Sequence, residues 1–382
     1  MNSIEESIIQ GQKIVIINQD SGYLMIDIAN AFFETGKDVV LITGKLSVRT
    51  TALSDKIELK KIIRYNRTNS INRIITWLIG AFQIWVIVKF KYRKHHLFVV
   101  SNPPFAPLIP LLLKNTYSLL IYDIYPDALT EAGMISEKSF LANFWKKANI
   151  KSFLKADKVY TITEGMKKVL CQYTEVKRIE VIPIWTDNSL KPVATVENNF
   201  IKKHKLEGQF IILYSGNLGS LNDVDILIDI VSKIRNKNVF LIIIGRGAKF
   251  DFIQKKAATY NLDNFLLMPW QEASELPHTF AAANLAIISL GKSASKLGIP
   301  SKIYNFMSVG APILGLASPG SDLDLLVNKY QIGKCFTPDK QEEIQKYIEY
   351  LVENDAICKK LGKNALSASS DFTETNVRKF ME

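Results

Sequence analysis

Cysteine and histidine are scarce in this chain. Among its 382 residues there are 3 cysteines, Cys171, Cys335 and Cys358, and 4 histidines, and their spacing matches neither a disulfide framework nor a zinc site. We therefore expect a protein of a reducing compartment that holds no structural metal.

A basic leader and a long membrane-spanning run are also missing. The first residues, MNSIEESIIQGQ, are acidic where a secretory signal would be basic, and the apolar run KIVIIN after them has the length of a strand. The most apolar segment, Ile74 to Val88, is shorter than the roughly 20 residues that a spanning helix needs. These features predict a cytoplasmic protein. For Ile74 to Val88 two alternatives stay open, a buried core helix and a helix lying in a membrane interface.

Acidic residues are few in one part of the chain. The formal net charge is +11, and residues 1–195 carry 26 Lys and Arg against 17 Asp and Glu, whereas residues 196–382 carry 22 against 20. Most of the excess lies between Lys45 and Lys94, where 12 basic residues face only Asp55 and Glu58. This basic region favours contact with an anionic membrane surface, to which each Lys or Arg contributes about 1 kcal/mol. Nucleic acid is not expected as a partner, because no recognition motif accompanies the charge.

Strand-like apolar runs alternate with helical segments along the whole chain. The first half contains KIVIIN, KDVVLIT, HLFVVS, SLLIYDI, KVYTIT and IEVIPI, and after a polar stretch the rhythm restarts with QFIILYSGNLG, VFLIIIGRG, FLLMPW and LAIISL. This rhythm predicts parallel sheets with crossover helices, and its restart predicts two doubly wound, Rossmann-like α/β domains. We expect domains at 1–190 and 191–368, with a short closing helix at 369–382. Ligands of such folds bind at the carboxyl ends of the strands, here in the cleft between the domains.

The segment from Lys296 to Gly315, KLGIPSKIYNFMSVGAPILG, combines a flexible glycine with a helix start. Gly298 lets the backbone approach a ligand closely, and Pro300 with Ser301 suits the opening of a helix over 301–309. Amides of a first helical turn bind diphosphate well. The alternative is an ordinary crossover helix with a Gly-Pro start.

Three other strand ends in the second half of the chain carry residues that also suit a nucleotide diphosphate. YSGNLGS brings Gly216, Asn217 and Gly219 to the end of one strand, and IIIGRG brings Gly245 and Arg246 to the end of the next. LLMPWQ places Pro269 and Trp270 where a base could stack, and Lys302 adds an ammonium that suits a diphosphate. Plain strand-to-helix turns and a core tryptophan are the alternatives for these segments.

The order of these segments resembles glycosyltransferase family 4, retaining enzymes of the GT-B fold that include bacterial O-antigen and colanic acid transferases. The resemblance covers nearly the whole chain, and its segments are IIRYN through SNPP, YDIYPDAL, ADKVYTITEGM, IEVIPIWTD, YSGNLGS, PWQEASELPHTFAAANLAIISL and PSKIYNFMSVGAPILG. It implies transfer of a sugar from a nucleotide-diphosphate donor, here a uridine diphosphate sugar, to a lipid-linked saccharide acceptor. It also implies leaving-group stabilisation by positive charge and helix amides, with no divalent metal and no cofactor besides the co-substrate.

The resemblance implies a division of the site residues between the two domains. The second domain would bind the donor through Gly216, Asn217, Gly219, Gly245, Arg246, Pro269, Trp270, Gly298, Ser301 and Asn305, with Lys302 at the phosphates. The first domain would hold the acceptor at Asp20, Ser21 and Gly22, with Asp123 and Asp127 facing the cleft. One of these two carboxylates would orient or deprotonate the acceptor hydroxyl, and the alternative is that they cap a loop. The family often has a histidine near this segment, but here Tyr122 precedes Asp123, so no histidine base is available there.

This chain departs from the family pattern at the paired glutamates, which correspond here to Leu297 and Asn305. Leu297 cannot hydrogen-bond a sugar, and Asn305 offers a neutral contact in place of a carboxylate. We interpret the change as a difference in specificity. Two further functions stay open, a sugar-nucleotide epimerase of the same fold and a non-catalytic scaffold or binding subunit of a polysaccharide assembly. The transferase hypothesis places the protein peripherally on the inner face of the cell membrane.

Overall fold

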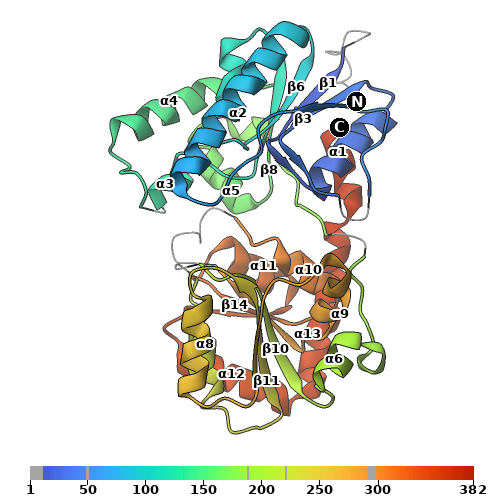
Figure 1. Cartoon of the computed structure of the whole chain (residues 1–382), viewed down its shortest axis with the longest axis vertical. Coiled ribbons are helices and arrows are strands. Elements are labelled where there is room, and N and C mark those ends of the chain that lie inside the picture. The colour runs from blue at the N-terminus through green and yellow to red at the C-terminus, as the bar shows by residue number, and fades with distance from the viewer. Residues whose placement is uncertain (1–11, 49–50, 132, 187–188, 220–221, 291–297) are drawn as a thin grey trace. The chain divides into compact units, whose positions relative to one another are not determined.

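The computed structural model describes residues 12–48, 51–131, 133–186, 189–219, 222–290 and 298–382. The chain divides into two compact units, one formed by residues 1–185 and 374–382 and the other by residues 186–373. Each unit is a parallel sheet covered by helices (Figure 1). The prediction of two doubly wound α/β domains is confirmed.

The sheet of the first unit has seven parallel strands in the order β5-β3-β1-β6-β7-β8-β9. Its strands are β1 (Ile14–Ile17), β3 (Val39–Thr43), β5 (Glu58–Lys61), β6 (His96–Val100), β7 (Tyr117–Ile121), β8 (Val159–Thr161) and β9 (Ile179–Val181), and a separate pair joins β2 (Asp20–Ser21) to β4 (Lys45–Leu46). The apolar runs predicted every one of the seven except β5, whose sequence ELKK is polar. The strand order reverses between β1 and β6, which is the position where doubly wound folds bind ligands.

Helices flank this sheet, and they differ in how much of their own surface is buried. They are α1 (Tyr23–Glu34), α2 (Ser70–Lys91), η2 (Ala106–Leu112), α3 (Asp127–Glu131), α4 (Phe140–Lys155), α5 (Glu164–Leu170), η3 (Val176–Arg178) and η8 (Glu374–Phe380). Helix α1 buries most of its length, whereas α2 and α4 bury one face only. The core includes Trp185, whose indole donates a hydrogen bond to the buried Asp27 carboxylate at 2.7 Å.

The second unit repeats the plan with six parallel strands in the order β12-β11-β10-β13-β14-β15. Its strands are β10 (Phe210–Asn217), β11 (Val239–Arg246), β12 (Phe265–Met268), β13 (Leu285–Ser289), β14 (Ile313–Leu316) and β15 (Gly333–Phe336). Its helices are η4 (Thr195–Glu197), α6 (Asn199–His204), α7 (Ile226–Val231), α8 (Phe250–Thr259), η5 (Ala273–Glu275), α9 (Leu276–Ala281), α10 (Lys302–Ser308), α11 (Asp322–Tyr330), α12 (Gln341–Glu353), α13 (Asp355–Ala368) and η7 (Ser369–Phe372). The order reverses between β10 and β13, so the candidate donor residues after β10 lie at the equivalent switch point.

Candidate functional site

The last residues of β10 and β11 approach each other so closely that a side chain does not fit at Gly245. The two strands pair in parallel with Gly216 opposite Gly245 and Asn217 opposite Arg246. A Cβ atom on Gly245 would lie 1.9 Å from the carbonyl oxygen of Gly216, and one on Gly216 would lie 2.3 Å from the hydroxyl of Tyr214. Pairing of the two strands therefore requires Gly245, and Gly216 leaves room for the Tyr214 ring of its own strand. Gly219 has more room, since its added Cβ would meet only the Asn217 side chain, at 3.2 Å.

Tyr214 and Lys249 hold the loop after β10 in place. The phenol of Tyr214 donates to the carbonyl oxygen of Asn217 at 2.8 Å, and Lys249 Nζ donates to the carbonyl oxygen of Asn222 at 2.6 Å. Lys249 Nζ also lies 2.6 Å from a carboxylate oxygen of Asp225. These contacts leave the Asn217 side chain at an exposed position at the carboxyl end of the sheet.

Four side chains from four different segments form a cationic and aromatic cluster at this edge, which we call the donor cluster: Tyr214, Arg246, Trp270 and Lys302. Lys302 Nζ lies 5.0 Å from the ring centroid of Trp270 and 6.0 Å from that of Tyr214. The guanidinium carbon of Arg246 lies 5.8 Å from the Trp270 ring. The structure thus brings together three residues that the sequence predicted from separate segments, and it adds Tyr214, which no sequence motif predicted as a ligand-binding residue.

Lys302 combines positive charge with burial. Burial lowers the pKa of its ammonium group to about 8, because a charged group loses solvation when it leaves water. Among the described residues, Lys302 has no carboxylate within ion-pair distance. An anionic ligand at this position would stabilise the charged form.

The helix start beside this cluster matches the predicted segment. Helix α10 runs over Lys302–Ser308, within one residue of the prediction at each end, and Gly298 has the positive φ of 138° that a side chain would disfavour. Ser301 is exposed and makes no side-chain capping bond, so its hydroxyl faces solvent. Asn305 accepts a hydrogen bond from the Thr186 hydroxyl at 2.8 Å. Leu297 and Lys296 lie outside the described residues.

Pro269 and Trp270 follow β12 at exposed positions. Trp270 has 46% of its surface accessible, so the alternative of a core tryptophan is wrong. The carbonyl oxygen of Pro269 accepts a hydrogen bond from the Gln271 side chain at 2.8 Å, which fixes the turn before the indole. The exposed part of the indole can contact a planar group of a ligand.

The predicted acceptor residues lie at the carboxyl edge of the sheet in the first unit. Asp20 forms an ion pair with Arg67 at 2.8 Å, while Ser21 is buried and donates to the carbonyl oxygen of Asn18 at 3.1 Å. Gly22 is the N-cap of α1, and an added Cβ there would meet nothing within 4 Å.

The two candidate carboxylates differ in their surroundings. Asp123 follows β7 and is exposed, and its backbone amide donates to the Ser101 hydroxyl at 3.1 Å. Asp127 begins α3 and accepts a hydrogen bond from the Tyr173 phenol, and Lys146 Nζ lies 3.7 Å from its other oxygen. The contacts of Asp127 indicate a structural function, whereas the side chain of Asp123 is available to a substrate.

Two arginines stack on aromatic rings near Asp20, and the sequence did not single them out beyond the basic region. The guanidinium carbon of Arg67 lies 4.8 Å from the ring centroid of Tyr65, and that of Arg73 lies 5.1 Å from Trp77. The Tyr65 and Trp77 rings are themselves stacked at 5.6 Å. We call these four residues the arginine cluster.

Comparison with known proteins decides the class of this fold. Residues 196–367 match the family model of glycosyl transferases group 1. The probable glycosyltransferase WbjE of Pseudomonas aeruginosa is 22% identical over 302 residues, which span 77% of this chain and 76% of that protein. The putative colanic acid biosynthesis glycosyl transferase WcaI of Escherichia coli is 23% identical over 63% of this chain and 61% of its own length. The crystal structure of Anabaena HepE in complex with UDP superimposes with a TM-score of 0.71 at 15% identity, covering 97% of this chain and 98% of HepE. This chain is a GT-B glycosyltransferase.

The glycosyltransferase resembles those of bacterial polysaccharide synthesis, as its sequence indicated. The matched family model covers the unit that contains the donor cluster. Among the described residues, no group of three or more His, Cys, Asp or Glu side chains is placed to hold a metal ion.

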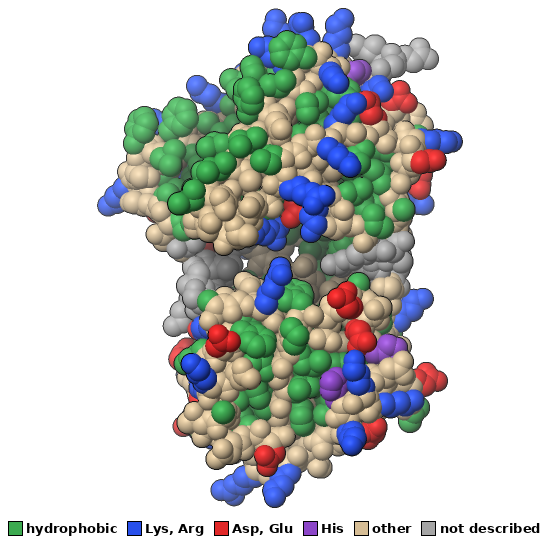
Figure 2. All heavy atoms as spheres, viewed as in Figure 1, with side chains coloured by type: hydrophobic (Ala, Val, Ile, Leu, Met, Phe, Trp, Pro, Cys, Tyr) green, Lys and Arg blue, Asp and Glu red, His purple; other side chains and the backbone are tan. Residues whose placement is uncertain are grey.

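The first unit of the glycosyltransferase exposes a large apolar face. Helix α2 is long and apolar enough to cross a membrane by length and composition, a test that core helices of soluble proteins also pass, and 28% of its most apolar stretch is buried. Figure 2 shows hydrophobic side chains gathered over α2 and α4, with Lys and Arg around them. The exposed apolar residues are Ile71, Ile74, Ile75, Leu78, Ile79, Phe82 and Phe90 of α2, Leu112 of η2, and Phe140, Leu141, Phe144, Ile150 and Leu154 of α4. The alternative of a buried core helix is therefore wrong for the outer side of α2.

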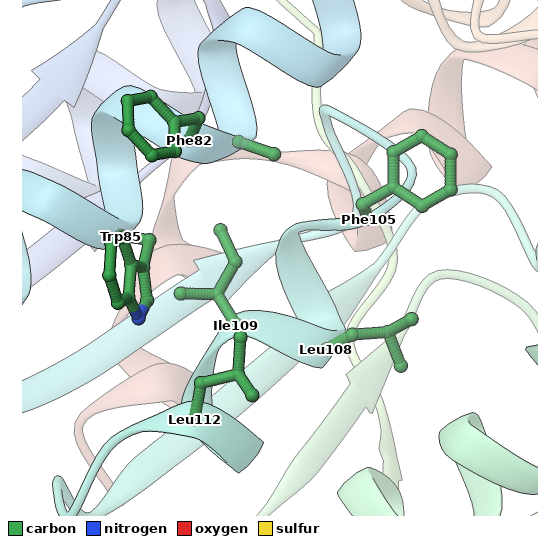
Figure 3. A pocket seen from close by; sticks show the side chains of 7 residues that line it. Phe82, Trp85, Phe105, Leu108, Ile109 and Leu112 are labelled. Atoms are coloured by element: carbon green, nitrogen blue, oxygen red, sulfur yellow. The ribbon is translucent and has the colours of Figure 1, made fainter.

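A groove with a volume of about 380 Å³ lies between α2 and η2 within this apolar face. Phe82 and Trp85 of α2 line it on one side, and Phe105 and the η2 residues Leu108, Ile109 and Leu112 line it on the other (Figure 3). Lys89 Nζ lies 4.4 Å from the Trp85 ring at the end of α2. The groove is apolar and has a cation at its edge.

Proposed function

We propose that this glycosyltransferase transfers a sugar from a uridine diphosphate donor to a lipid-linked saccharide, with retention at the anomeric carbon and without a divalent metal. The observation that carries the proposal is the donor cluster, in which Lys302 and Arg246 flank the exposed Trp270. Two cations can neutralise a diphosphate, and an exposed indole offers its face to a planar base.

The donor cluster suits the main task of the reaction. The bond between the anomeric carbon and the diphosphate oxygen breaks, and negative charge develops on the departing UDP. Lys302 and Arg246 would stabilise that charge, which is the function that a metal ion performs in other transferases. The acceptor hydroxyl forms the new bond, and Asp123 is the exposed carboxylate that would orient it or take its proton.

The apolar face of the first unit supports a lipid-linked acceptor at an anionic membrane surface. Helices α2 and α4 contain 7 Lys and Arg and no Asp or Glu, and both expose aromatic and aliphatic side chains. Apolar side chains that enter the lipid interface, together with cations that attract anionic headgroups, are the two contributions that hold a peripheral protein on a bilayer. We therefore propose peripheral association with the inner face of the cell membrane through this face and the basic region 45–94.

The deciding experiment incubates the protein with a panel of nucleotide sugars and a bacterial membrane fraction and measures release of nucleoside diphosphate. We expect UDP release that requires the membrane fraction, and the anomeric configuration of the product, read by NMR, tests retention. The Lys302→Ala variant should lose a charge-assisted contact, about 1.5–3 kcal/mol, and so bind UDP at least tenfold more weakly. Lys237→Ala is the matched control, because Lys237 is exposed before the amino end of β11, far along the strand from the cluster. Unchanged UDP affinity in Lys302→Ala would show that the cluster is not the donor site.

A sugar-nucleotide epimerase of the same two-domain architecture remains the second candidate, and Asn305 in place of a carboxylate keeps a non-catalytic binding subunit as the third. The epimerase would convert a UDP sugar into an isomer without any acceptor. The same assay without membranes distinguishes the two, because isomer formation there contradicts the transferase proposal. UDP binding with no product on any membrane fraction would instead indicate a binding subunit.

A further inference from the structure

The arginine cluster contains a guanidinium without an anionic partner. Arg73 is partly buried, its Nη2 atom lies 3.6 Å from the sulfur of Met134, and no carboxylate among the described residues lies within 4 Å of it. Its Nε atom is buried without a hydrogen-bond partner in the described part of the chain. Burial of a cation and of an unsatisfied donor costs free energy. This position therefore favours an anionic ligand that pairs with the guanidinium charge and accepts a hydrogen bond from Nε.

The second arginine of the cluster is positioned to share that ligand. Arg67 and Arg73 stack on Tyr65 and Trp77, whose rings lie 5.6 Å apart, so both guanidiniums are held beside one aromatic pair. Both charges also act on the phenol of Tyr65. Arg67 is 68% exposed, and its ion pair with Asp20 is a surface contact that is worth little. It can therefore exchange this carboxylate for a phosphate at small cost.

The charges around the cluster limit which anion it can take. The carboxylates of Asp20 and Asp123 both act on Tyr65 together with the two arginines. Asp20 already pairs with Arg67, and the two carboxylates weaken the attraction of this surface for an extended polyanion such as a nucleic acid backbone. A compact phosphate or diphosphate that contacts the guanidiniums directly competes best, because paired arginine contacts to phosphate are short and strong.

The surface next to the cluster is apolar. Arg73 lies in the first turn of α2, and the outer side of the same turns exposes Ile71, Ile74, Ile75 and Leu78, with exposed fractions from 47% to 70%. A ligand bound at Arg73 therefore has phosphate-binding groups on one side and a hydrocarbon-binding surface on the other. This arrangement fits an amphiphile and does not fit a free sugar phosphate.

We propose that Arg67 and Arg73 bind the phosphate groups of the acceptor lipid, and that its hydrocarbon chain lies on the exposed face of α2. The inference rests on the proposed lipid-linked acceptor and names the residues that select it. Asp123, whose carboxylate acts electrostatically on Tyr65, is the acidic side chain that we assign to the sugar end of the same lipid.

The test measures binding of farnesyl diphosphate, farnesol and inorganic pyrophosphate to the full chain by calorimetry. Wild-type protein should bind farnesyl diphosphate most tightly, because the other two probes each lack one half of the ligand. Arg73→Gln should lower that affinity about tenfold or more, and Arg67→Gln with Arg73→Gln should lower it further. Arg64→Gln is the matched control, since Arg64 is exposed on the same loop, and it should stay within about twofold of wild type. UDP binding, measured on each variant, reports that the second unit is intact, and a thermal melt reports on the first.

Each outcome is decisive. If wild-type protein does not bind farnesyl diphosphate, or if the double variant binds it as wild type does, the site is wrong even where UDP release from membranes persists. If phosphatidylglycerol vesicles lose affinity in the variants and farnesyl diphosphate does not bind, the arginines contact bulk phospholipid and the acceptor assignment is overturned. If the variants lose farnesyl diphosphate while wild-type protein releases no UDP with any membrane, the lipid site stands and the transferase proposal fails.

Discussion

Lys302 shows how one buried cation can make donor binding depend on pH. Its pKa is lowered to about 8, so the ammonium is mostly charged at pH 7 and mostly neutral at pH 9. A bound diphosphate stabilises the charged form and raises the pKa again.

We therefore expect UDP affinity to fall as the pH rises above about 8, by up to tenfold per pH unit, and binding near pH 8 to take up a proton. Calorimetry in two buffers of different ionisation enthalpy measures the uptake. Lys302→Ala should bind more weakly and lose most of this dependence. A wild-type affinity that stays constant from pH 7 to pH 9.5 would exclude Lys302 from the phosphates.

Substitution by alanine should have different effects on stability at Gly245 and at Gly22. An added Cβ on Gly245 would overlap the carbonyl oxygen of Gly216, and we expect Gly245→Ala to destabilise the protein by about 1–3 kcal/mol or more and to weaken UDP binding. Gly22→Ala, which adds a Cβ in open space at an ordinary φ of −107°, should leave thermal stability unchanged. Thermal unfolding of both variants tests the two predictions, and equal melting temperatures would contradict the close packing of β11 against β10 at Gly245.

Asp123 and Asp127 should separate turnover from stability. Asp123→Asn should lower turnover about 10²- to 10⁴-fold while UDP affinity and melting temperature stay unchanged, as expected for a general base or orienting group. Asp127→Asn weakens the contacts with Tyr173 and Lys146 and should cost about 1–3 kcal/mol of stability with a smaller effect on turnover. If Asp127→Asn instead lowers turnover and Asp123→Asn lowers stability, then Asp127 is the carboxylate that contacts the acceptor and Asp123 has the structural function.

Helix α2 shows what hydrophobic pattern can and cannot predict about an element. Its composition predicted an apolar helix correctly, but both of its sides are apolar, so sequence periodicity could not tell which side faces solvent. Burial of Trp77, Ile84 and Val88 identifies the inner side. The exposed apolar side of helix α4 was still harder to predict, because four lysines in the same helix lower the average hydrophobicity of its sequence.

The apolar face of α2 and α4 predicts binding to anionic vesicles. Changing Lys89, Lys91, Arg93 and Lys94 to Gln should weaken binding to phosphatidylglycerol vesicles about 100-fold or more, at roughly 1 kcal/mol for each cation. The double variant Ile75→Gln with Leu78→Gln should also weaken vesicle binding. Added salt should not change the size of this loss, because the contribution of these two side chains is apolar and is not screened. Vesicle sedimentation measures both, and Lys233→Gln with Lys237→Gln in the second unit is the control. Undiminished binding of both variants would contradict the docking face.

At the scale of the whole molecule, the sequence predicted the architecture well and the contacts poorly. Apolar runs marked most strands, and their order predicted two doubly wound units. Arg246, Trp270 and Lys302 were selected because each follows a strand or starts a helix. Tyr214 and Arg73 were not selected, because a ring folded over a neighbouring glycine, or an arginine stacked on a tryptophan, depends on tertiary packing that no local pattern records.

The end of the described chain was the least predictable part. A closing helix was expected at 369–382, and the structure forms η7 and η8 there, with residues 374–382 packed in the first unit. Phe380 lies 5.5 Å from the ring of Phe98 and 4.9 Å from that of Tyr160.

Phe380→Ala should therefore destabilise the first unit by about 3–5 kcal/mol, because it removes a buried ring from between two others. Lys379→Ala, at the exposed neighbouring position, should cost less than about 0.5 kcal/mol. Denaturant unfolding followed by tryptophan fluorescence measures the difference. Equal stabilities would show that η8 is not part of the core.

Because the end of the chain returns to the first unit, the core of that unit can be completed only late in translation. The ribosome must make all 188 residues of the second unit before it adds Val377 and Phe380, which complete the core of the first. At about 5–20 residues per second, the first unit waits roughly 10–40 s with Phe98 and Tyr160 incompletely covered. The core of the first unit therefore cannot be completed before the whole second unit has been made, so the first unit cannot finish folding ahead of the second during translation.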